Sequence, residues 1–510
     1  MYLTQSLHRA VQQSPDRVMT ICGDRVRTTR QVADRVAALA GALRELGVQT
    51  GDRVGILSLN SDRFHELAFA CWWLGAALHP LNIRWSAAEI AYAINDSGTE
   101  LLLVDDTFTA LVPQLQQRCT GLRTVLHGGE EDTPAGLLGY EAVIGGGCPV
   151  PDLRIGGDAL ALLLYTGGTT GAPKGVMASH DTMMTSLLGT AVAEVSSRRD
   201  GVSLFTAPLF HIAAILGWYE QFMVGGTGVF VPQFTAEGFL DAVQRHRVNS
   251  CILIPVMVQM ICEHPDFESY DLSSLERIIY GGASSSEALL RHALATFPQA
   301  RFSQGYGMTE TGVLTMLGAD EHRDPELRHA RSVGRAVAHV ELAVMDVDGT
   351  VLDAGQVGEV VTRGNHVMKG YWNKPEQTAQ VVRDGWMHTG DGGYLDADGY
   401  LYIVDRLKDM IISGGENVYS AEVENALASH PGVAQCAVIG VPDEKWGERV
   451  HAVVVPRPGQ APTLEVLRAH TAELIAGYKC PRSLDLVKAL PMTAAGKILK
   501  RRLRDSYVNS

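Results

Sequence analysis

The sequence predicts an α/β protein with parallel sheets, followed by a small α+β domain at the C-terminal end. Two observations support this prediction. Helical and strand patterns alternate through most of the chain, which is typical of parallel sheets because parallel neighbours need a crossover connection. The pattern then changes character near residue 405. With 510 residues, the chain is long enough to bury a large core.

The first elements can be identified from the spacing of apolar residues. A stripe spaced by four and three residues predicts one helix face, and it consists of Val32, Val36, Leu39, Leu43 and Leu46. Gly47 follows as the expected end of this helix. The apolar runs Arg53–Leu59 and Leu101–Val104 are short and bounded by polar residues, so we interpret both as buried strands.

The C-terminal part has a different pattern. Residues 340–404 form a run of short strands and turns that is dense in Gly and Asp. After it, helical patterns at 421–429 and 464–475 flank a strand pattern at 434–441, which suits one small α+β domain.

The expected domain boundaries follow from this change of pattern. We predict an N-terminal domain at 1–404, a hinge at 405–408 and a C-terminal domain at 409–510. A Gly- and Pro-containing stretch at 150–160 predicts a weaker division between two lobes of the large domain.

Composition and charge exclude several classes of protein. The formal net charge is −14, whereas a non-specific nucleic-acid binder normally carries positive charge. The best candidate span, Leu67–Leu78, is too short to cross a bilayer, and the first residues lack the apolar core of a signal peptide. The eight cysteines include no C-x-x-C pair, which argues against zinc and redox motifs. We therefore expect a cytoplasmic protein with no nucleic-acid partner and no transmembrane segment.

The strongest local motif spans residues 165–176 and reads Tyr-Thr-Gly-Gly-Thr-Thr-Gly-Ala-Pro-Lys-Gly-Val, directly after an apolar strand pattern. Its glycines let backbone N–H groups approach phosphate oxygens, and its threonines add hydroxyl donors. Lys174 supplies a positive charge. The motif is not a Walker loop, because no glycine precedes the lysine and no Ser or Thr follows it. A polyphosphate-binding loop is therefore favoured over a plain surface loop.

Further segments carry groups that suit a nucleotide. Residues 304–311 read Gln-Gly-Tyr-Gly-Met-Thr-Glu-Thr, in which Tyr306 can stack on a base and Glu310 can hold Mg²⁺. Asp391 follows Trp-Met-His-Thr-Gly and can accept hydrogen bonds from ribose hydroxyls. Charged residues gather at 405–417, beside the expected boundary, and a basic segment lies at 496–502.

These segments, in this order, resemble the adenylate-forming acyl-CoA synthetase superfamily, the AMP-binding enzymes. That superfamily includes acyl- and aryl-CoA ligases, peptide-synthetase adenylation domains and beetle luciferases. Residues 280–283, 358–364 and 367–371 match the family as well. Residues 405–419 and 442–448 are most similar to bacterial fatty-acyl-CoA ligases.

The resemblance implies an adenylate-forming enzyme fold, with a large N-terminal domain of stacked α/β subdomains and a small mobile α+β C-terminal domain. It implies an acid–thiol ligase, an AMP-forming acyl-CoA synthetase that uses ATP, Mg²⁺ and CoA. A carboxylate first attacks the α-phosphate of ATP and releases pyrophosphate. The thiolate of CoA then displaces AMP from the acyl-adenylate. The resemblance leaves the oligomeric state undecided, with a homodimer as one alternative.

The resemblance also implies roles for particular residues. The ATP- and AMP-binding set is Thr166, Gly167, Gly168, Thr169, Thr170, Gly282, Ala283, Gln304, Gly305, Tyr306, Gly307, Asp391 and Arg406. The catalytic set is Lys174, Thr309, Glu310 and Lys497, with Glu310 also as the Mg²⁺ ligand. Lys408 matches the hinge, and Gly414, Gly415 and Trp446 match the CoA side.

Two positions depart from the family pattern. Gly167 stands where Ser is usual, so one hydroxyl contact to phosphate is missing. Ser420 stands where Pro is common after Tyr419. Neither position carries a group that reacts.

The segment 207–218 corresponds to the pocket for the acid substrate. Amino-acid-activating relatives place an aspartate after the aromatic residue, but here His211 follows Phe210. A buried ammonium without a partner is costly, so we expect an acid with an apolar tail. The expected acyl site consists of His211, Ala213, Ala214 and Gly217.

A medium- to long-chain fatty acid is favoured, and an aryl acid such as benzoate, cinnamate or ferulate is the alternative. Two readings from other classes are a luciferase-like oxygenase and a non-catalytic acyl-adenylate sensor. Lys174, Glu310 and Lys497 are all in place, which argues against the sensor.

Overall fold

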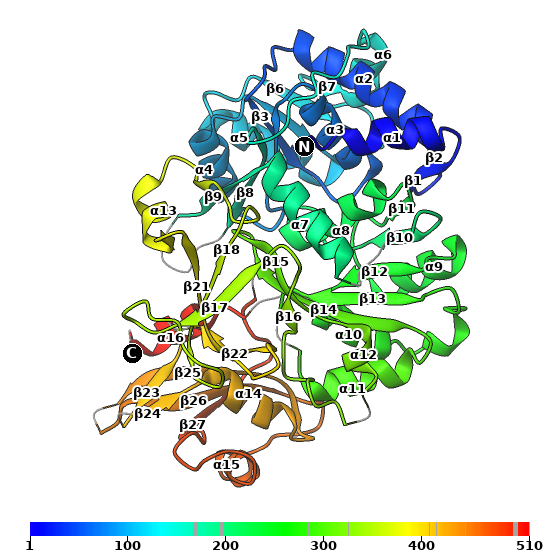
Figure 1. The fold of residues 1–510 in the computed structure, drawn as a ribbon. Coiled ribbons are helices and arrows are strands. Elements are labelled where there is room, and N and C mark those ends of the chain that lie inside the picture. The colour runs from blue at the N-terminus through cyan, green and yellow to red at the C-terminus, as the bar shows by residue number, and fades with distance from the viewer. Residues whose placement is uncertain are drawn as a thin grey trace.

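The computed structural model describes residues 1–166, 172–193, 198–283, 285–324, 326–406, 409–414, 416–443, 445–492 and 498–508. Within these residues the chain forms four sheets with helices packed against them (Figure 1). The blue, cyan and green elements make up the larger part of the molecule. The orange and red C-terminal elements gather beside it, next to β22 (Leu401–Arg406).

The first sheet is mostly parallel and joins distant parts of the sequence. Its core runs β14–β13–β12–β10–β11–β1 with parallel neighbours, while β15, β16 and β2 are added antiparallel at the edges. In sheet order the strands are β16 (Arg335–Ala336), β15 (Gly312–Leu317), β14 (Arg301–Met308), β13 (Arg277–Gly281), β12 (Ser250–Leu253), β10 (Val202–Phe205), β11 (Thr227–Phe230), β1 (Val18–Cys22) and β2 (Arg25–Thr28).

The second sheet is built largely from the segment that the first sheet leaves out. In order it comprises β19 (Gly370–Tyr371), β9 (Lys174–Ser179), β8 (Leu160–Thr166), β4 (Ala77–Pro80), β3 (Arg53–Leu57), β5 (Leu101–Val104), β6 (Thr124–His127) and β7 (Leu138–Gly139). The antiparallel pair β8–β9 brings Thr166 opposite Lys174, so the two described ends of the phosphate-loop motif meet.

Two smaller antiparallel-rich sheets complete the fold. The third contains β17 (Glu341–Met345), β18 (Gly358–Arg363), β20 (Val382–Arg383), β21 (Trp386–Leu395) and β22. The fourth contains β23 (Ile411–Ser413), β24 (Glu416–Val418), β25 (Val433–Asp443), β26 (Gly447–Pro456) and β27 (Ser483–Leu486).

Helices connect and cover these strands. Before the phosphate loop they are α1 (Gln5–Gln13), α2 (Thr29–Glu45), α3 (Asp62–Trp73), α4 (Ala87–Ser97), α5 (Val112–Arg118) and α6 (Tyr140–Gly146). After it come α7 (His180–Val192), α8 (Ile212–Met223), α9 (Ala236–His246), α10 (Pro255–Cys262), α11 (Glu287–Thr296), α12 (Ala319–His322) and α13 (Pro375–Val381). The C-terminal helices are α14 (Ser420–Ala428), α15 (Leu464–Ala472) and α16 (Lys500–Val508).

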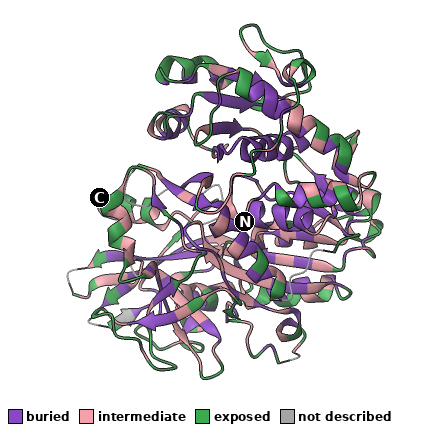
Figure 2. Ribbon diagram, turned by 45° about the horizontal axis from the view of Figure 1, so that its top comes forward, coloured by how far each residue is buried: buried purple, intermediate pink, exposed green. Residues whose placement is uncertain are grey.

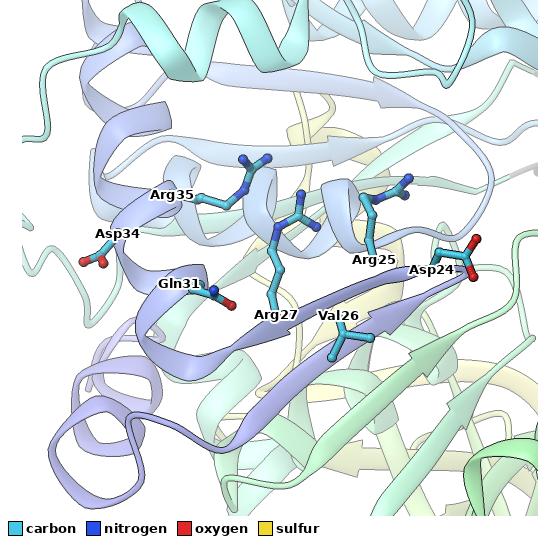
Figure 3. Close-up of a pocket in the computed structure, with 7 residues that line it drawn as sticks. All are labelled: Asp24, Arg25, Val26, Arg27, Gln31, Asp34 and Arg35. Atoms are coloured by element: carbon cyan, nitrogen blue, oxygen red, sulfur yellow. The ribbon is translucent and has the colours of Figure 1, made fainter.

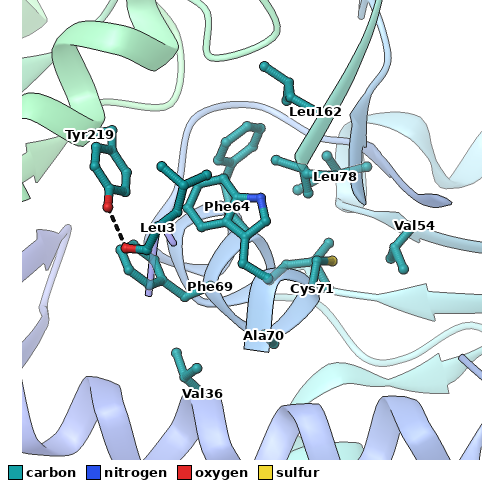
Figure 4. Packing of buried hydrophobic residues seen from close by; sticks show 14 of the residues in the cluster. Leu3, Val36, Val54, Phe64, Phe69, Ala70, Cys71, Leu78, Leu162 and Tyr219 are labelled. Atoms are coloured by element: carbon teal, nitrogen blue, oxygen red, sulfur yellow. Dashed lines mark hydrogen bonds between the residues drawn. The ribbon is translucent and has the colours of Figure 1, made fainter. Parts of the chain in front are cut away.

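The main core lies where α3 and α8 pack against each other. Trp218 of α8 is fully buried and makes ring contacts with Phe69 and Trp72 of α3. The hydroxyl of Tyr219 donates to the backbone oxygen of Leu3, which ties the N-terminal segment to α8 (Figure 4). Buried residues follow the strands and inward helix faces, whereas exposed ones mark turns and outer faces (Figure 2). This core is a rigid support behind α8.

The predicted fold class is confirmed, and several elements match closely. The predicted first helix is α2, capped by the Thr28 side chain and followed by Gly47 with a positive φ of 98°. The strand Leu101–Val104 is found as predicted. The division at 150–160 is wrong, because β8 and β9, which follow this stretch, continue the sheet that holds β3–β7.

Candidate active site

Tyr306, Asp391 and Arg406 form one connected group. Cross-strand pairing of β21 with β22 sets Asp391 opposite Arg406, and Arg406 Nε lies 2.6 Å from Asp391 Oδ1. The hydroxyl of Tyr306, at the end of β14, donates to the other carboxylate oxygen at 2.6 Å. Burial and the Asp391 charge raise the pKa of Tyr306 well above its ordinary value, so the phenol keeps its proton and stays a donor.

The Asp391 carboxylate is therefore oriented from two sides. It is only 5% exposed, and charge-assisted contacts at these distances are strong. The structure thus joins three of the sequence-predicted nucleotide residues into one unit, although they come from two sheets.

Glu310 and Lys174 both contact Tyr371, a residue for which no individual role was expected. Glu310 is 8% exposed and accepts a hydrogen bond from the Tyr371 hydroxyl at 2.8 Å. The Lys174 ammonium lies 4.8 Å from the centroid of the Tyr371 ring. Thr309, next to Glu310, is half-buried. Gly167, Gly168, Thr169 and Thr170 of the motif lie outside the described residues.

β13 and β14 contain glycines at points where the backbone of the neighbouring strand leaves no room for a Cβ atom. A Cβ on Gly281 would lie 2.4 Å from the backbone oxygen of Gly305, and one on Gly307 would lie 1.9 Å from that of Gly312. Gly282 has a φ of 77°, where only glycine is unstrained, and Ala283 follows it. Gln304 accepts a hydrogen bond from Tyr280 at 3.2 Å. These contacts hold β14 close to both β13 and β15, beside the expected adenine-side residues.

The expected acyl residues divide over two faces of α8. Ala213 is exposed, and Gly217 follows it by one helical turn on the same face. A Cβ on Gly217 would come within 1.8 Å of Ile252 Cδ1, so the helix packs tightly on β12 at this point. Ala214 is 5% exposed and belongs to the apolar core instead. His211 directly precedes α8 without a side-chain hydrogen bond to the helix end, and its ring centroid lies 4.2 Å from that of Phe210.

Two residues to which the sequence assigned no role, Ile252 and Ile254, lie beside the expected acyl residue Gly217 and the expected nucleotide residue Gly282. Along β12 and the residue after it, Cys251 and Leu253 are buried, while Ile252 and Ile254 alternate with them on the other side and are partly exposed. Ile252 meets Gly217, and Ile254 Cγ2 lies 3.8 Å from where a Cβ on Gly282 would be. The period-two pattern of Cys-Ile-Leu-Ile could have suggested this face. We call Ala213, Gly217, Ile252 and Ile254 the α8–β12 wall.

On another face of α8, Ile212 and Leu216 border a cavity of about 10 Å³ that Thr309 and His366 also line. This is room for about one water molecule. Burial lowers the pKa of His366 to about 4, so this imidazole is neutral at ordinary pH.

Asp405, the residue before Arg406, contacts a residue on the C-terminal side of the expected domain boundary. Asp405 accepts hydrogen bonds from both the backbone N–H and the hydroxyl of Ser420. Lys500 in turn donates to the Ser420 hydroxyl and lies 2.8 Å from Glu424 Oε1. We call these four residues the Asp405 network. Lys408, Gly415 and Lys497 lie outside the described residues.

On the expected CoA side, Gly414 has a φ of 66° and lies against Trp446, whose ring would be 2.8 Å from a Cβ at that position. The Gly414 N–H donates to the Trp446 backbone oxygen at 2.8 Å. The two predicted residues are thus neighbours across β23 and β26.

A larger hollow of about 490 Å³ has none of these residues in its lining, and the residues that do line it are labelled in Figure 3. It is formed by β2 and the start of α2, and Asp24, Arg25, Val26, Arg27, Gln31, Asp34 and Arg35 line it. Its guanidinium groups already pair with buried carboxylates: Arg25 lies 2.8 Å from Asp62 and Arg35 lies 2.7 Å from Glu66. Because these charges are compensated, its size does not make it an anion site.

The helices of the described segments include none with the length and apolar character of a membrane span.

Two family models match the chain. The AMP-binding enzyme model covers residues 7–372, and the AMP-binding enzyme C-terminal domain model covers residues 422–497. A feruloyl-CoA synthase from Amycolatopsis sp. is 40% identical, with 98% of each chain covered. A long-chain-fatty-acid–CoA ligase from Mycobacterium tuberculosis is 36% identical, with 92% of this chain and 90% of the relative covered. The crystal structure of an anthranilate CoA ligase with anthranoyl-AMP superposes with a TM-score of 0.91 at 28% identity, covering 99% and 97% of the two chains.

Proposed function

The chain belongs to the AMP-binding enzyme family, as an ATP-dependent acid–thiol ligase that forms acyl-adenylates, and we therefore propose that it joins an acid with an apolar tail to coenzyme A. The observation that carries this proposal is the α8–β12 wall, whose four side chains are all uncharged and apolar or absent. An acid with a charged tail would lose its hydration there without gaining a partner, which is costly.

Among such acids, we place an aryl acid of the ferulate type first. The feruloyl-CoA synthase relative is 40% identical over nearly the whole chain, and this order reverses the one that the sequence alone favoured. The tight contact between Gly217 and Ile252 also supports it, because a long alkyl tail passing there would have to separate α8 from β12. A flat aromatic ring needs a shallower pocket than a long alkyl chain does.

A medium- to long-chain fatty acid is the second candidate. The relative from Mycobacterium tuberculosis supports it, and so does the apolar character of the α8–β12 wall. On this alternative each added methylene should contribute about 0.8 kcal/mol, or about fourfold in efficiency, until the pocket ends.

The residue roles proposed for this reaction are those that the family resemblance implies. Asp391 and Arg406 would bind the ribose, Tyr306 would lie against the adenine, and Lys174 would bind phosphate oxygens. Thr309 would donate to the α-phosphate, and Lys497 would stabilise charge between the carboxylate and that phosphate. Glu310 offers buried carboxylate oxygens, a donor type that suits Mg²⁺, which when bound neutralises phosphate charge.

The deciding experiment measures pyrophosphate release across ferulate, cinnamate, benzoate and straight-chain acids, with and without CoA. High kcat/KM for an aryl acid with a flat fatty-acid series would support the first candidate. A fourfold rise per methylene would support the second. Acid-dependent pyrophosphate release without any CoA thioester would contradict the ligase proposal. Oxygen consumption in place of CoA would indicate the oxygenase, and no release with any acid would indicate the sensor.

A variant pair tests the α8–β12 wall itself. Ala213→Phe adds a ring on the exposed helix face without meeting the Ile252 contact that blocks a side chain at Gly217. We expect KM for the preferred acid to rise on the order of tenfold with little change for ATP. Val347→Phe, at a fully exposed turn, is the matched control and should change neither. If the two variants had equal effects, the α8–β12 wall would not be part of the acid-binding site.

A further inference from the structure

The segment 367–372 forms backbone hydrogen bonds with two parts of the candidate site. Tyr371 in β19 pairs with Val176 in β9, and the N–H of Trp372 donates to the Gly175 oxygen at 2.7 Å. From the same segment, the N–H of Met368 donates to the Glu310 backbone oxygen at 2.8 Å. The segment thus holds the strand that begins with Lys174 and the turn that carries Glu310.

Tyr371 makes the side-chain contacts at this junction. Its ring is 6% exposed and packs with Val176, Met368 and Met387. The ring faces the Lys174 ammonium at 4.8 Å, a cation–π geometry, and its hydroxyl donates to Glu310 Oε1 at 2.8 Å. One rigid side chain therefore touches a cation with its face and an anion with its edge.

This arrangement differs from a direct ion pair between Lys174 and Glu310. A buried carboxylate attracts a nearby ammonium strongly, and a direct Lys–Glu pair would satisfy both groups internally. Lys174 and Glu310 each contact Tyr371, and the described residues show no ion pair between the two. The phenol satisfies the carboxylate with a neutral donor, and the ring satisfies the ammonium without neutralising it. Both charges stay available for a phosphate and its metal.

We propose that Tyr371 is a positioning residue for adenylation, which holds the Glu310 carboxylate and the Lys174 ammonium apart so that both face ATP. This inference rests on the roles proposed above for Lys174 and Glu310. Without the phenol hydroxyl, Glu310 loses its donor and turns toward Lys174, so that the nucleotide and its metal have to break an ion pair before they bind. The second half-reaction, which involves no β- or γ-phosphate, does not depend on this separation.

The test uses Tyr371→Phe, which keeps the ring and removes only the hydroxyl. The Mg²⁺ concentration for half-maximal adenylation should rise about tenfold, as expected for loss of a hydrogen bond to a charged group. ATP binding by calorimetry in the presence of MgCl₂ should weaken by a similar factor. Conversion of supplied acyl-adenylate and CoA to thioester should stay within about twofold of wild type.

A matched control separates positioning from packing. Tyr140→Phe makes the same chemical change at a buried tyrosine whose hydroxyl donates to Glu66 at 2.9 Å, far from the site in the sequence. It should lower the thermal midpoint about as much as Tyr371→Phe while leaving the Mg²⁺ dependence unchanged. If both variants change stability alone, Tyr371 is only a core residue.

A double variant tests the mechanism directly. Glu310→Gln keeps an acceptor for the phenol but removes the charge, so Tyr371→Phe should add little further loss of ATP affinity in that background. Additive losses, or equal losses of both half-reactions, would overturn the inference. If wild-type protein releases no pyrophosphate with any acid, the proposed function fails, whereas the ATP calorimetry of the same variants still decides the role of Tyr371.

Discussion

Asp405 and Arg406 are consecutive residues of β22, yet their side chains hold different regions of the molecule. Arg406 pairs with Asp391, which also accepts a hydrogen bond from Tyr306, and both of these partners lie before the boundary expected at 405–408. Asp405 reaches Ser420 and, through it, Lys500, which lie after that boundary. Successive side chains of a strand point to opposite faces, so one step along β22 separates the two tasks.

The two sides of β22 should therefore control different steps of the reaction. The Arg406 side contacts groups that would bind the nucleotide, which is present in both half-reactions. The Asp405 network crosses the expected hinge, so it should bear on the orientation of the C-terminal domain alone.

The largest expected effect comes from a residue carried by the C-terminal side. Lys497→Ala should slow ATP-dependent adenylation by on the order of 10²–10³, because a preorganised charge at the reacting oxygens is lost. Supplied acyl-adenylate and CoA should still give thioester. Lys488→Ala, at an exposed position of the same region, should change neither step. Equal loss of both steps in Lys497→Ala would refute the assignment.

A smaller effect is expected on the Arg406 side. Asp391→Asn removes the ion pair with Arg406 and weakens the contact with Tyr306, so both half-reactions should slow by about tenfold or more. Separate single-turnover measurements of the two steps check this. Asp398→Asn, in an exposed turn between β21 and β22, is the control. If only one of the two half-reactions slowed, the Arg406 side would not serve both steps.

Ser420→Pro should act on orientation only. Ser420 is the first residue of α14 and the preceding Tyr419 is extended, with φ −84° and ψ 119°, so proline fits the backbone while removing both donors to Asp405. The ratio of the two half-reaction rates should shift by about threefold to tenfold, with KM for ATP unchanged. Ser420→Ala, which keeps the N–H, should shift it less. A changed KM for ATP would show that the two sides of β22 are not independent.

The smallest effect on catalysis is expected from His65, which lies in the core and on neither side of β22. Burial lowers the pKa of His65 to about 3, so between pH 6.5 and 3 the unfolded chain binds a proton that the folded chain does not. Stability should therefore fall as pH drops through this range. His65→Phe should reduce the slope by up to about 1.4 kcal/mol per pH unit, measured by urea unfolding, with both half-reactions unchanged at pH 7.5. An unchanged slope would mean that His65 is protonated in the folded state.

Local patterns explain what the sequence predicted well. The helix containing Val32 and Leu43 and the strand Leu101–Val104 depend on spacing within a few residues, and both were found. The phosphate-loop motif was recognised for the same reason, although its roles stay predictions. The failures concern pairing over long distances. The sequence offered no sign that β1 lies beside β11, or that Tyr371 reaches Glu310.

The acid site shows the same limit at smaller scale. His211, Ala213, Ala214 and Gly217 are close in sequence, but a helix turns Ala214 toward the core while Ala213 and Gly217 share another face. Ile252 enters the wall only because β12 packs on that face. Residue type alone could not reveal this, since isoleucine is common in any buried strand.

The pairing of β1 with β11 has a consequence for synthesis of the chain. Val18–Cys22 leaves the ribosome early, but its parallel partner Thr227–Phe230 follows only after about 200 further residues. At roughly 5–20 residues per second, synthesis of the intervening chain takes on the order of 10–40 s. During this time β1 can pair with β2 on one edge, but the edge that will pair with β11 stays open. During that interval it is a template for association with other nascent chains. Production in cells should therefore depend on translation speed and on chaperones that cover this segment, even for variants whose finished fold is unaltered.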